Sequence, residues 1–374
     1  MRRTINKLFF LVVLLEVLSS PSGYILAQQQ RFNVSLRVDY ASAQAVLEFF
    51  ERTTFNAARV AEQRGNQLAA ATSLLLEREE RPADDFIPQL ESFRDHPGTK
   101  DLYGFTPLRN ALPRVKALLK EIKRRQLERR VVATLESYFP QDAAINIEIP
   151  VYVVAIGNER AAAFVRRVVW NGDVPRFVGP SEGTPVIVLN LARTAAYGDR
   201  VEEQFVETLA TLTHEAFHAV FDSYRGASDR AAEDAASALG ELVQNEGIAY
   251  YISLSIHIGG ETPASEWFIA TRRAVESLDK AVSELQSPSI TPSRAKDLLM
   301  NANLSGSFEA NYGATAGLRM AYEIDKRLGR SALTQSVSDG WRKFFEIYGR
   351  VSSQSGDLPR FSEKVLEELL RRNP

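Results

Sequence analysis

The stretch TLATLTHEAFHAVFDSYRG, Thr208 to Gly226, contains two of the four histidines of this 374-residue chain. His214 and His218 are four residues apart, with Glu215 between them. Four residues of an α-helix span about 400°, so the two imidazoles project from one face, one turn apart. That is the geometry in which two imidazoles reach one zinc ion. Glu215 lies about 100° round the helix from His214, where it can act on a zinc-bound water without being a ligand.

The residues around this pair predict a half-buried helix. No proline or glycine occurs between Val201 and Arg225, and apolar residues recur at helical spacing: Phe205, Leu209, Leu212, Phe217, Val220 and Phe221. Histidine pairs also occur as hydrogen-bonded core residues, so the motif alone leaves a structural role open. A hydrolytic zinc site keeps three protein ligands and one open position, so the downstream sequence must supply a third ligand.

The following helix offers five candidates for that ligand: Glu233, Asp234, Glu241, Glu246 and His257. Glu246 lies in VQNEGIAYY, where Gly247 removes a side chain beside it and apolar residues continue a buried segment. A carboxylate among apolar residues is costly unless it is paired or bound to a metal. Glu233 and Asp234 are typical of helix-start charges, and His257 is more typical of a helix end, although it can also approach the site. Position therefore favours Glu246.

Two motifs together resemble a known family. HEAFH (His214 to His218) followed by NEGIA (Asn245 to Ala249) is similar to the gluzincin, or peptidase MA-like, zinc metallopeptidases. The spacing of 28 residues from His218 to Glu246 fits best the looser set of bacterial zinc-dependent peptidases in this group. The run NYGATAGLRMAYEIDKRLGRSALTQSV resembles the tyrosine-led helix of the group. The resemblance covers about Pro185 to Val337 and leaves out the N-terminal half.

The resemblance implies zinc bound by His214, His218 and Glu246, with Glu215 as the general base that activates water against a peptide or protein substrate. It also implies one further donor to the developing oxyanion. Tyr312, at the head of the tyrosine-led run, is the first choice, and Tyr250, Tyr251 and His257 follow. The candidates to orient the imidazoles through their free ring nitrogens are Asp222, Asp234 and Asn245.

Composition excludes several other chemistries. The chain has no cysteine, which removes disulfides, thiolate zinc sites and thiol nucleophiles. The net charge of −2 gives no overall field that would recruit nucleic acid or an anionic membrane. The oligomeric state stays open.

The N-terminus predicts export. An apolar run, Leu8 to Leu15, follows the basic residues Arg2, Arg3 and Lys7. Small and turn-forming residues come next, so residues 1–27 are expected to be a signal peptide cut after Ala27. The alternative is an uncleaved anchor, but a membrane span needs roughly 20 apolar residues and this run is shorter. The mature protein is then periplasmic or extracellular in a bacterium.

Hydrophobic periodicity predicts an α+β fold that is predominantly helical. Residues 28–140 are expected to form a mainly helical region. Its apolar stripe predicts one long amphipathic helix from Leu112 to Phe139. Residues 141–374 are expected to form a zincin-like catalytic domain, with a small sheet before the HExxH helix and a helical C-terminal part. Thr184 to Ala192 is either an ordinary buried strand or a strand whose free edge binds an extended substrate.

Two other functions remain open on the sequence. The first is a zinc hydrolase that acts on a non-peptide amide. The second is a non-enzymatic, helical exported protein in which the histidine pair is structural.

Overall fold

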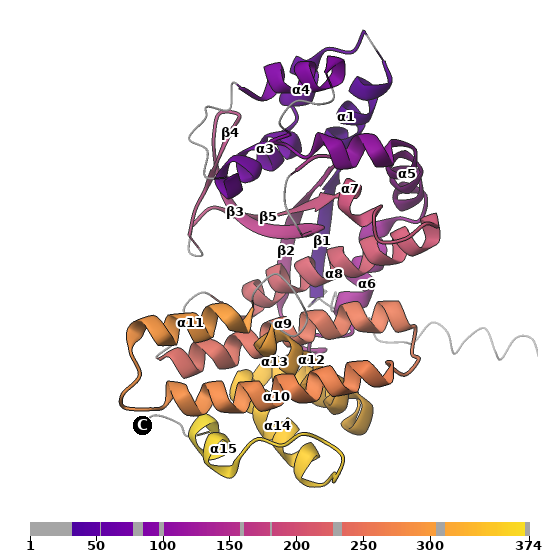
Figure 1. The fold of residues 1–374 in the computed structure, drawn as a ribbon. Coiled ribbons are helices and arrows are strands. Elements are labelled where there is room, and N and C mark those ends of the chain that lie inside the picture. Colours follow the sequence, from indigo (N-terminus) through magenta and orange to yellow (C-terminus); the bar gives the residue numbers. More distant parts are fainter. Residues whose placement is uncertain are drawn as a thin grey trace, which may run out of the picture. The chain divides into compact units, whose positions relative to one another are not determined.

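Alternating apolar residues build a mixed five-stranded sheet in the first half of the chain (Figure 1). The computed structural model describes residues 32–52, 54–77, 85–96, 101–157, 161–179, 182–226, 234–303 and 311–370. The predicted signal peptide, 1–27, lies outside these residues. The strands are β1 (Phe32–Asp39), β2 (Ile145–Val154), β3 (Ala163–Asn171), β4 (Val174–Phe177) and β5 (Thr184–Asn190), in the order β1-β2-β5-β3-β4.

The centre of the sheet is buried on both faces. β2 pairs in parallel with β1 and with β5, whereas β3 is antiparallel to both β5 and β4. Residues Ile149–Val154 of β2 are all buried, as expected for a central strand covered by helices. β5 has β2 on one side and β3 on the other, so the idea that it offers a free edge to substrate is wrong. A β-branched run predicts burial, but which strands flank it depends on the tertiary fold.

Helices cover both faces of this sheet. α1 and α3 pack on one face and α8 on the other (Figure 1). The helices of this part are α1 (Ala41–Glu51), α2 (Ala57–Ala61), α3 (Arg64–Glu77), α4 (Phe86–Asp95), α5 (Phe105–Arg124), α6 (Leu127–Glu136), α7 (Leu191–Thr194) and α8 (Val201–Arg225).

The single helix expected from Leu112 to Phe139 is in fact two helices, α5 and α6. The break lies at Gln126, whose φ of 52° is left-handed. The break lets α6 pack against β1 and α8, while the guanidinium of Arg125 covers the ring of Phe205 at 4.6 Å. The apolar stripe continues through the break, so periodicity alone does not reveal it.

The second half of the chain is a layer of helices around a buried one. These helices are α9 (Ala235–Ile258), α10 (Ser265–Leu285), α11 (Pro292–Ala302), α12 (Tyr312–Leu328), α13 (Arg330–Asp339), α14 (Trp341–Ser353) and α15 (Glu363–Leu370). α12 is buried on every side from Tyr312 to Ile324 and packs against α9, α10, α13 and α14. α9 packs against both α8 and α12, so it joins the sheet layer to this helical layer.

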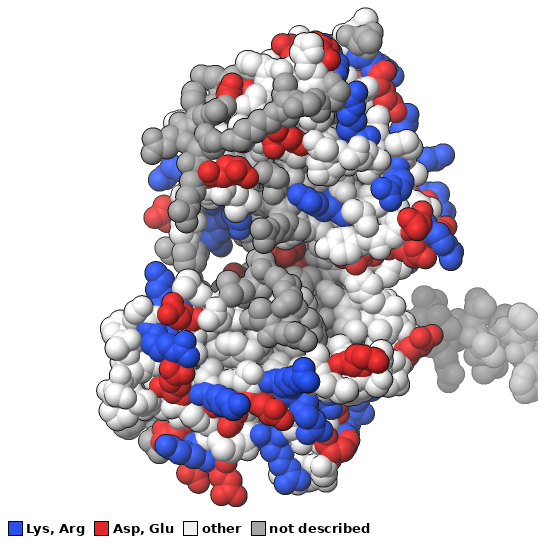
Figure 2. All heavy atoms as spheres, in the orientation of Figure 1, with Lys and Arg blue, Asp and Glu red and all other residues white. Residues whose placement is uncertain are grey.

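The predicted fold class is confirmed, because the protein is α+β and mainly helical, with a small sheet before the histidine-bearing helix. Residues from Phe32 onward form one unit by their contacts, and β1 of the N-terminal region belongs to the same sheet as β2. The domain boundary near residue 140 stays a prediction. No helix among the described residues is long and apolar enough to span a bilayer. Acidic and basic side chains are interspersed over the face drawn in Figure 2.

Candidate metal centre

α8 presents its two histidines to α9. Leu212, Phe217 and Val220 of the same helix are buried. Two threonines inside this helix, Thr208 and Thr213, donate their hydroxyl protons to the carbonyl oxygens four residues back, each at 2.6 Å. The buried face of α8 is thus apolar or internally hydrogen-bonded, and the imidazoles project from the remaining face.

α9 carries Glu246 at the point where it crosses α12. A Cβ added to Gly247 would lie 2.3 Å from the carbonyl carbon of Gly317, and one added to Gly317 would lie 2.0 Å from the carbonyl oxygen of Val243. The two backbones therefore touch, and only glycine fits on either side. This contact fixes the distance between Glu246 and α8, because the next residue of α9, Gly247, packs directly against α12.

This crossing predicts a stability effect opposite to helix propensity. Alanine in place of glycine normally stabilises a helix interior by about 1 kcal/mol. We expect Gly247→Ala instead to lower the free energy of unfolding by about 1–3 kcal/mol, because the methyl group overpacks a backbone contact. Chemical denaturation measures this. Gly356→Ala is the matched control, since a Cβ there meets nothing within 4 Å. Equal free energies of unfolding for the two variants would contradict the close backbone contact between α9 and α12.

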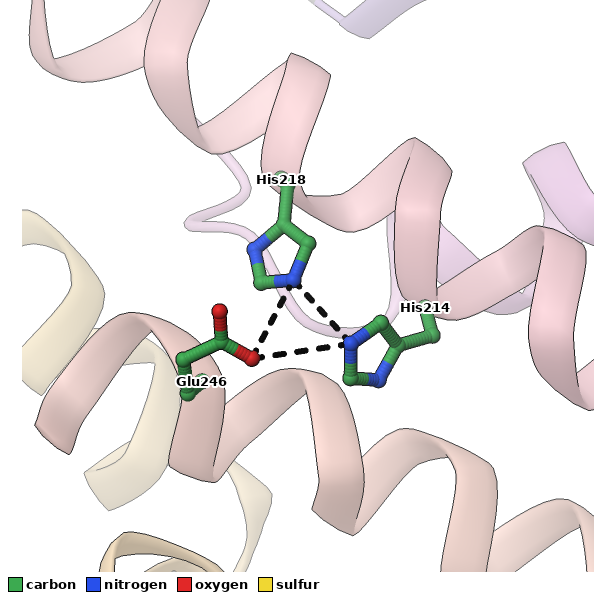
Figure 3. A group of neighbouring side chains, drawn as sticks. All are labelled: His214, His218 and Glu246. Carbon is green, nitrogen blue, oxygen red and sulfur yellow. Dashed lines mark hydrogen bonds and ion pairs between the residues drawn. The ribbon is translucent and has the colours of Figure 1, made fainter. Parts of the chain in front are cut away.

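Three ligand atoms converge between α8 and α9 (Figure 3). The two Nε2 atoms of His214 and His218 are 3.1 Å apart, and Oε2 of Glu246 lies 3.6 and 3.5 Å from them, respectively. Donor atoms about 2.0–2.1 Å from a tetrahedral zinc lie roughly 3.3 Å from one another. The side chains are 13%, 15% and 18% exposed, so the group is shielded but reachable. Donor type, spacing and exposure all fit a zinc ion with a vacant position.

Neighbouring amides orient two of the three ligands. The Nδ1 atom of His218 lies 3.0 Å from Oδ1 of Asn245, which holds the proton on Nδ1 and leaves Nε2 free for a metal. The amide of Asn303 donates to Oε1 of Glu246 at 2.6 Å. Asp234, another candidate from the sequence, instead caps α9 by accepting from the backbone N–H of Ser237 at 2.7 Å.

The electrostatics of the site favour a cation. Burial lowers the pKa of His218, but the carboxylates of Glu246 and Glu215 and the hydrogen bond to Asn245 together outweigh burial and raise the pKa to about 9. Burial likewise raises the pKa of Glu246, but His218 and His214 more than reverse this and hold it well below its usual range. The carboxylate thus stays ionised and needs a positive partner. A proton on His218 supplies that charge, and a metal ion can replace this proton.

Glu215 lies beside the three ligands but does not belong to their group. Burial raises the pKa of Glu215, and the charges of His214 and His218 oppose this rise. Glu246 adds to the rise and Arg166, on β3, opposes it. A carboxylate whose pKa is raised by desolvation, next to a metal site, is the type of group that exchanges protons at neutral pH.

The structure ranks the predicted tyrosines differently from the sequence. Tyr312 is buried, and its hydroxyl donates to the carbonyl oxygen of Leu298 on α11 at 2.8 Å, so its proton is already committed. Tyr250 instead packs its ring edge-on against the imidazole of His214, with 4.7 Å between centroids. Burial raises the pKa of Tyr250 to about 12, with Glu246 and Glu215 adding to the rise. The oxyanion role of Tyr312 stays a prediction that these contacts do not favour.

Two other candidates lie outside the group of ligands. The hydroxyl of Tyr251 hydrogen-bonds to Asp325 on α12. His257, in the last turn of α9, binds the carboxylate of Glu207 at 2.8 Å and the carbonyl oxygen of Ser253 at 2.8 Å. His257 thus links α9 to α8 about three helical turns beyond Glu246, which agrees with its expected position at a helix end.

Sequence reasoning missed Asn303 and Arg166. Asn303 is 57 residues from Glu246, and Arg166 comes from the sheet. Neither stands in a motif with the ligands, so no local signal pointed to them.

The geometry defines a class of protein, namely an α+β protein whose consecutive helices offer two imidazoles and one carboxylate to a single metal ion. A family model described as "Putative zinc dependent peptidase (DUF5700)" matches residues 53–356, and the chain belongs to this family. The predicted likeness to uncharacterised zinc-dependent peptidases is thereby confirmed, and the match also includes most of the N-terminal helical region. Zinc is the cofactor in the family's description, and His214, His218 and Glu246 are the residues that can hold it. No curated protein and no solved structure matches the chain at a significant level.

Proposed function

We propose that this chain is an exported zinc metallopeptidase that cleaves peptide bonds with Glu215 as its general base. The observation that carries the proposal is the tetrahedral spacing of the three ligand atoms, 3.1–3.6 Å, with Glu215 in the next position after His214. Membership of a family described by zinc and peptidase activity supports it. The basic and apolar N-terminus, with its expected cut after Ala27, supports export.

The chemistry divides between the cofactor and the chain. When bound, zinc supplies a Lewis acid that lowers the pKa of water from about 15.7 towards 7 and polarises a carbonyl group. His214, His218 and Glu246 would hold the zinc ion, which leaves a position for water. Glu215 accepts a proton from the attacking water as the C–O bond to the carbonyl carbon forms, and it later delivers this proton to the leaving nitrogen as the peptide C–N bond breaks. Asn245 accepts the Nδ1 proton of His218 and so keeps Nε2 of that ring free to bind the metal.

Tyr250 is our choice of oxyanion donor in place of Tyr312. Its ring lies against His214, and its phenol stays protonated at neutral pH. We expect Tyr250→Phe to lower kcat by about 10²-fold with little change in zinc content, since it removes one hydrogen bond to developing charge. Tyr312→Phe should leave kcat nearly unchanged and cost about 1 kcal/mol of stability through the lost bond to Leu298. The kcat for peptide hydrolysis by the two variants distinguishes the two tyrosines. A large loss in Tyr312→Phe with little loss in Tyr250→Phe would instead assign the oxyanion role to Tyr312.

The proposal is tested by incubating the purified mature protein with a defined mixture of peptides. Cleavage should occur with zinc, stop after chelation and return when zinc is restored. Turnover confined to small non-peptide amides would favour the first alternative. A protein that binds no stoichiometric zinc would favour the non-enzymatic one. N-terminal sequencing of the chain from the culture medium or periplasm should begin at Gln28, and retention of residues 1–27 in a membrane fraction would contradict export.

A further inference from the structure

Asn303 makes a contact with Glu246 that the proposed reaction does not use. Its amide nitrogen donates to Oε1 at 2.6 Å, while Oε2 lies within 3.6 Å of both imidazole Nε2 atoms. In Figure 3 the lines to both rings start from one oxygen of Glu246, Oε2, while the other oxygen has no line to either ring. The carboxylate therefore has one oxygen for the metal and one for the amide.

The end of α11, where Asn303 follows the last helical residue, is held against the start of α12 by other contacts. The hydroxyl of Tyr312 donates to the carbonyl oxygen of Leu298 at 2.8 Å. A Cβ added to Gly313 would lie 2.8 Å from both Cβ and the carbonyl oxygen of Ala302, so this packing is also too close for any side chain. The position of Asn303 does not depend on its own amide group.

α12 thus locates Glu246 from two directions. It presses on Gly247 through Gly317, and it sets the end of α11 through Tyr312 and Gly313. The positions of both Glu246 and its amide partner, Asn303, are therefore set by the same buried helix, α12. The tyrosine-led run, which the sequence suggested as a source of a catalytic hydroxyl, acts here as the support of the third metal ligand.

We propose that Asn303 is a positioning residue of the metal site, an inference that rests on the proposed function. Its amide holds Oε1 so that Glu246 binds the metal through Oε2 alone. A carboxylate without such a partner can turn and chelate zinc through both oxygens, which would add a fifth donor beside the position that water needs. A neutral donor suits this role because it leaves the charge of the carboxylate to the metal, whereas lysine or arginine would compensate that charge.

A purely structural role of Asn303 predicts something different. Its backbone N–H already caps α11 through the carbonyl oxygen of Met300 at 3.3 Å, which any residue except proline can do. The side chain is not part of that cap, and the residue is exposed. Loss of the amide should therefore change metal binding without changing the stability of the metal-free protein.

The test uses the full mature chain, stripped of metal, with two substitutions. Asn303→Ala removes the donor, and Asn303→Leu keeps nearly the same shape without a donor. Asn301→Ala is the matched control, because Asn301 is also an exposed asparagine and lies just before Asn303, on α11. Competition with a chelator of known affinity measures zinc binding. We expect both Asn303 variants to bind zinc about 10- to 100-fold more weakly than the wild type, and the control to match it.

A spectroscopic measurement reports the coordination directly. Cobalt(II) in place of zinc absorbs strongly in the visible range when it is four-coordinate and weakly when it is five-coordinate. The cobalt-loaded wild type should show the strong bands, and both Asn303 variants should show weakened bands as the freed carboxylate chelates. Thermal denaturation of the metal-free proteins should give the same Tm for all four.

The outcomes separate this inference from the function. A wild type that binds neither zinc nor cobalt refutes the proposed function itself. A wild type that binds both, with Asn303 variants of equal affinity and equal spectrum, refutes the inference and leaves the function standing. Weaker binding accompanied by a matching loss of metal-free stability in both variants assigns Asn303 a structural role and also overturns the inference.

Discussion

Glu215→Gln should lower peptide hydrolysis by about 10²- to 10⁴-fold, the usual contribution of a positioned general base. Glutamine keeps the shape of the side chain but cannot accept a proton at neutral pH. Glu215 is not one of the three ligands, so the variant should hold as much zinc as the wild type. The loss should appear in kcat, because the proton transfer belongs to the chemical step.

Glu202→Gln is the matched control for this experiment. Glu202 lies in the first turn of the same helix with its side chain 52% exposed, so its loss removes a carboxylate of α8 without touching the site. Initial rates on one peptide substrate, with zinc content measured in parallel, give the comparison. Cleavage that persists in Glu215→Gln would exclude Glu215 as the base, and zinc loss in that variant would make it a structural part of the site instead.

His218→Ala should abolish stoichiometric zinc binding. The substitution removes one of three donor atoms and also leaves Oδ1 of Asn245 without its imidazole partner. A ligand that binds only the folded state stabilises it by about 4 kcal/mol at 1,000 times its dissociation constant. We therefore expect added zinc to raise the Tm of the metal-free wild type and to leave that of His218→Ala unchanged. Metal analysis of the dialysed proteins gives the stoichiometry.

His257→Ala supplies the control for this second prediction. His257 is also a histidine beside a carboxylate and is also at the α8–α9 contact, but its partner is Glu207 and its side chain is 40% exposed. The variant should keep one zinc per chain and the thermal response to added zinc. Zinc retained by His218→Ala would instead support a structural histidine pair, the reading that makes the protein non-enzymatic.

The histidine pair and its glutamate were predictable because their chemistry is local. Spacing of four residues places His214 and His218 on one helical face whatever the rest of the fold does. Glu246 could be chosen over Asp234 because a carboxylate within a buried segment needs a partner, whereas Asp234 begins a helix, and the structure shows it as the cap of α9. The helical second half and the alternating strands followed from periodicity in the same way.

Other features were not predictable, for a different reason in each case. Gln126 breaks a continuous amphipathic stripe through one backbone angle, which no side-chain pattern encodes. β5 looks like a strand from its sequence, but two earlier strands of the chain, β2 and β3, pair with its two sides and leave it no free edge. Tyr312 lies in a run that resembles a family motif, yet its hydroxyl is directed to α11.

The sequence by itself determined which residues are chemically able to bind a metal, and that two of them share a helical face. Only the tertiary structure decided that Oε2 of Glu246 meets both Nε2 atoms, because this depends on two glycines that let α9 and α12 touch. It also decided that Asn303, 57 residues away, holds the other oxygen. Periodicity is a property of neighbours along one chain segment, whereas a metal site is set by distances between segments that only packing brings together.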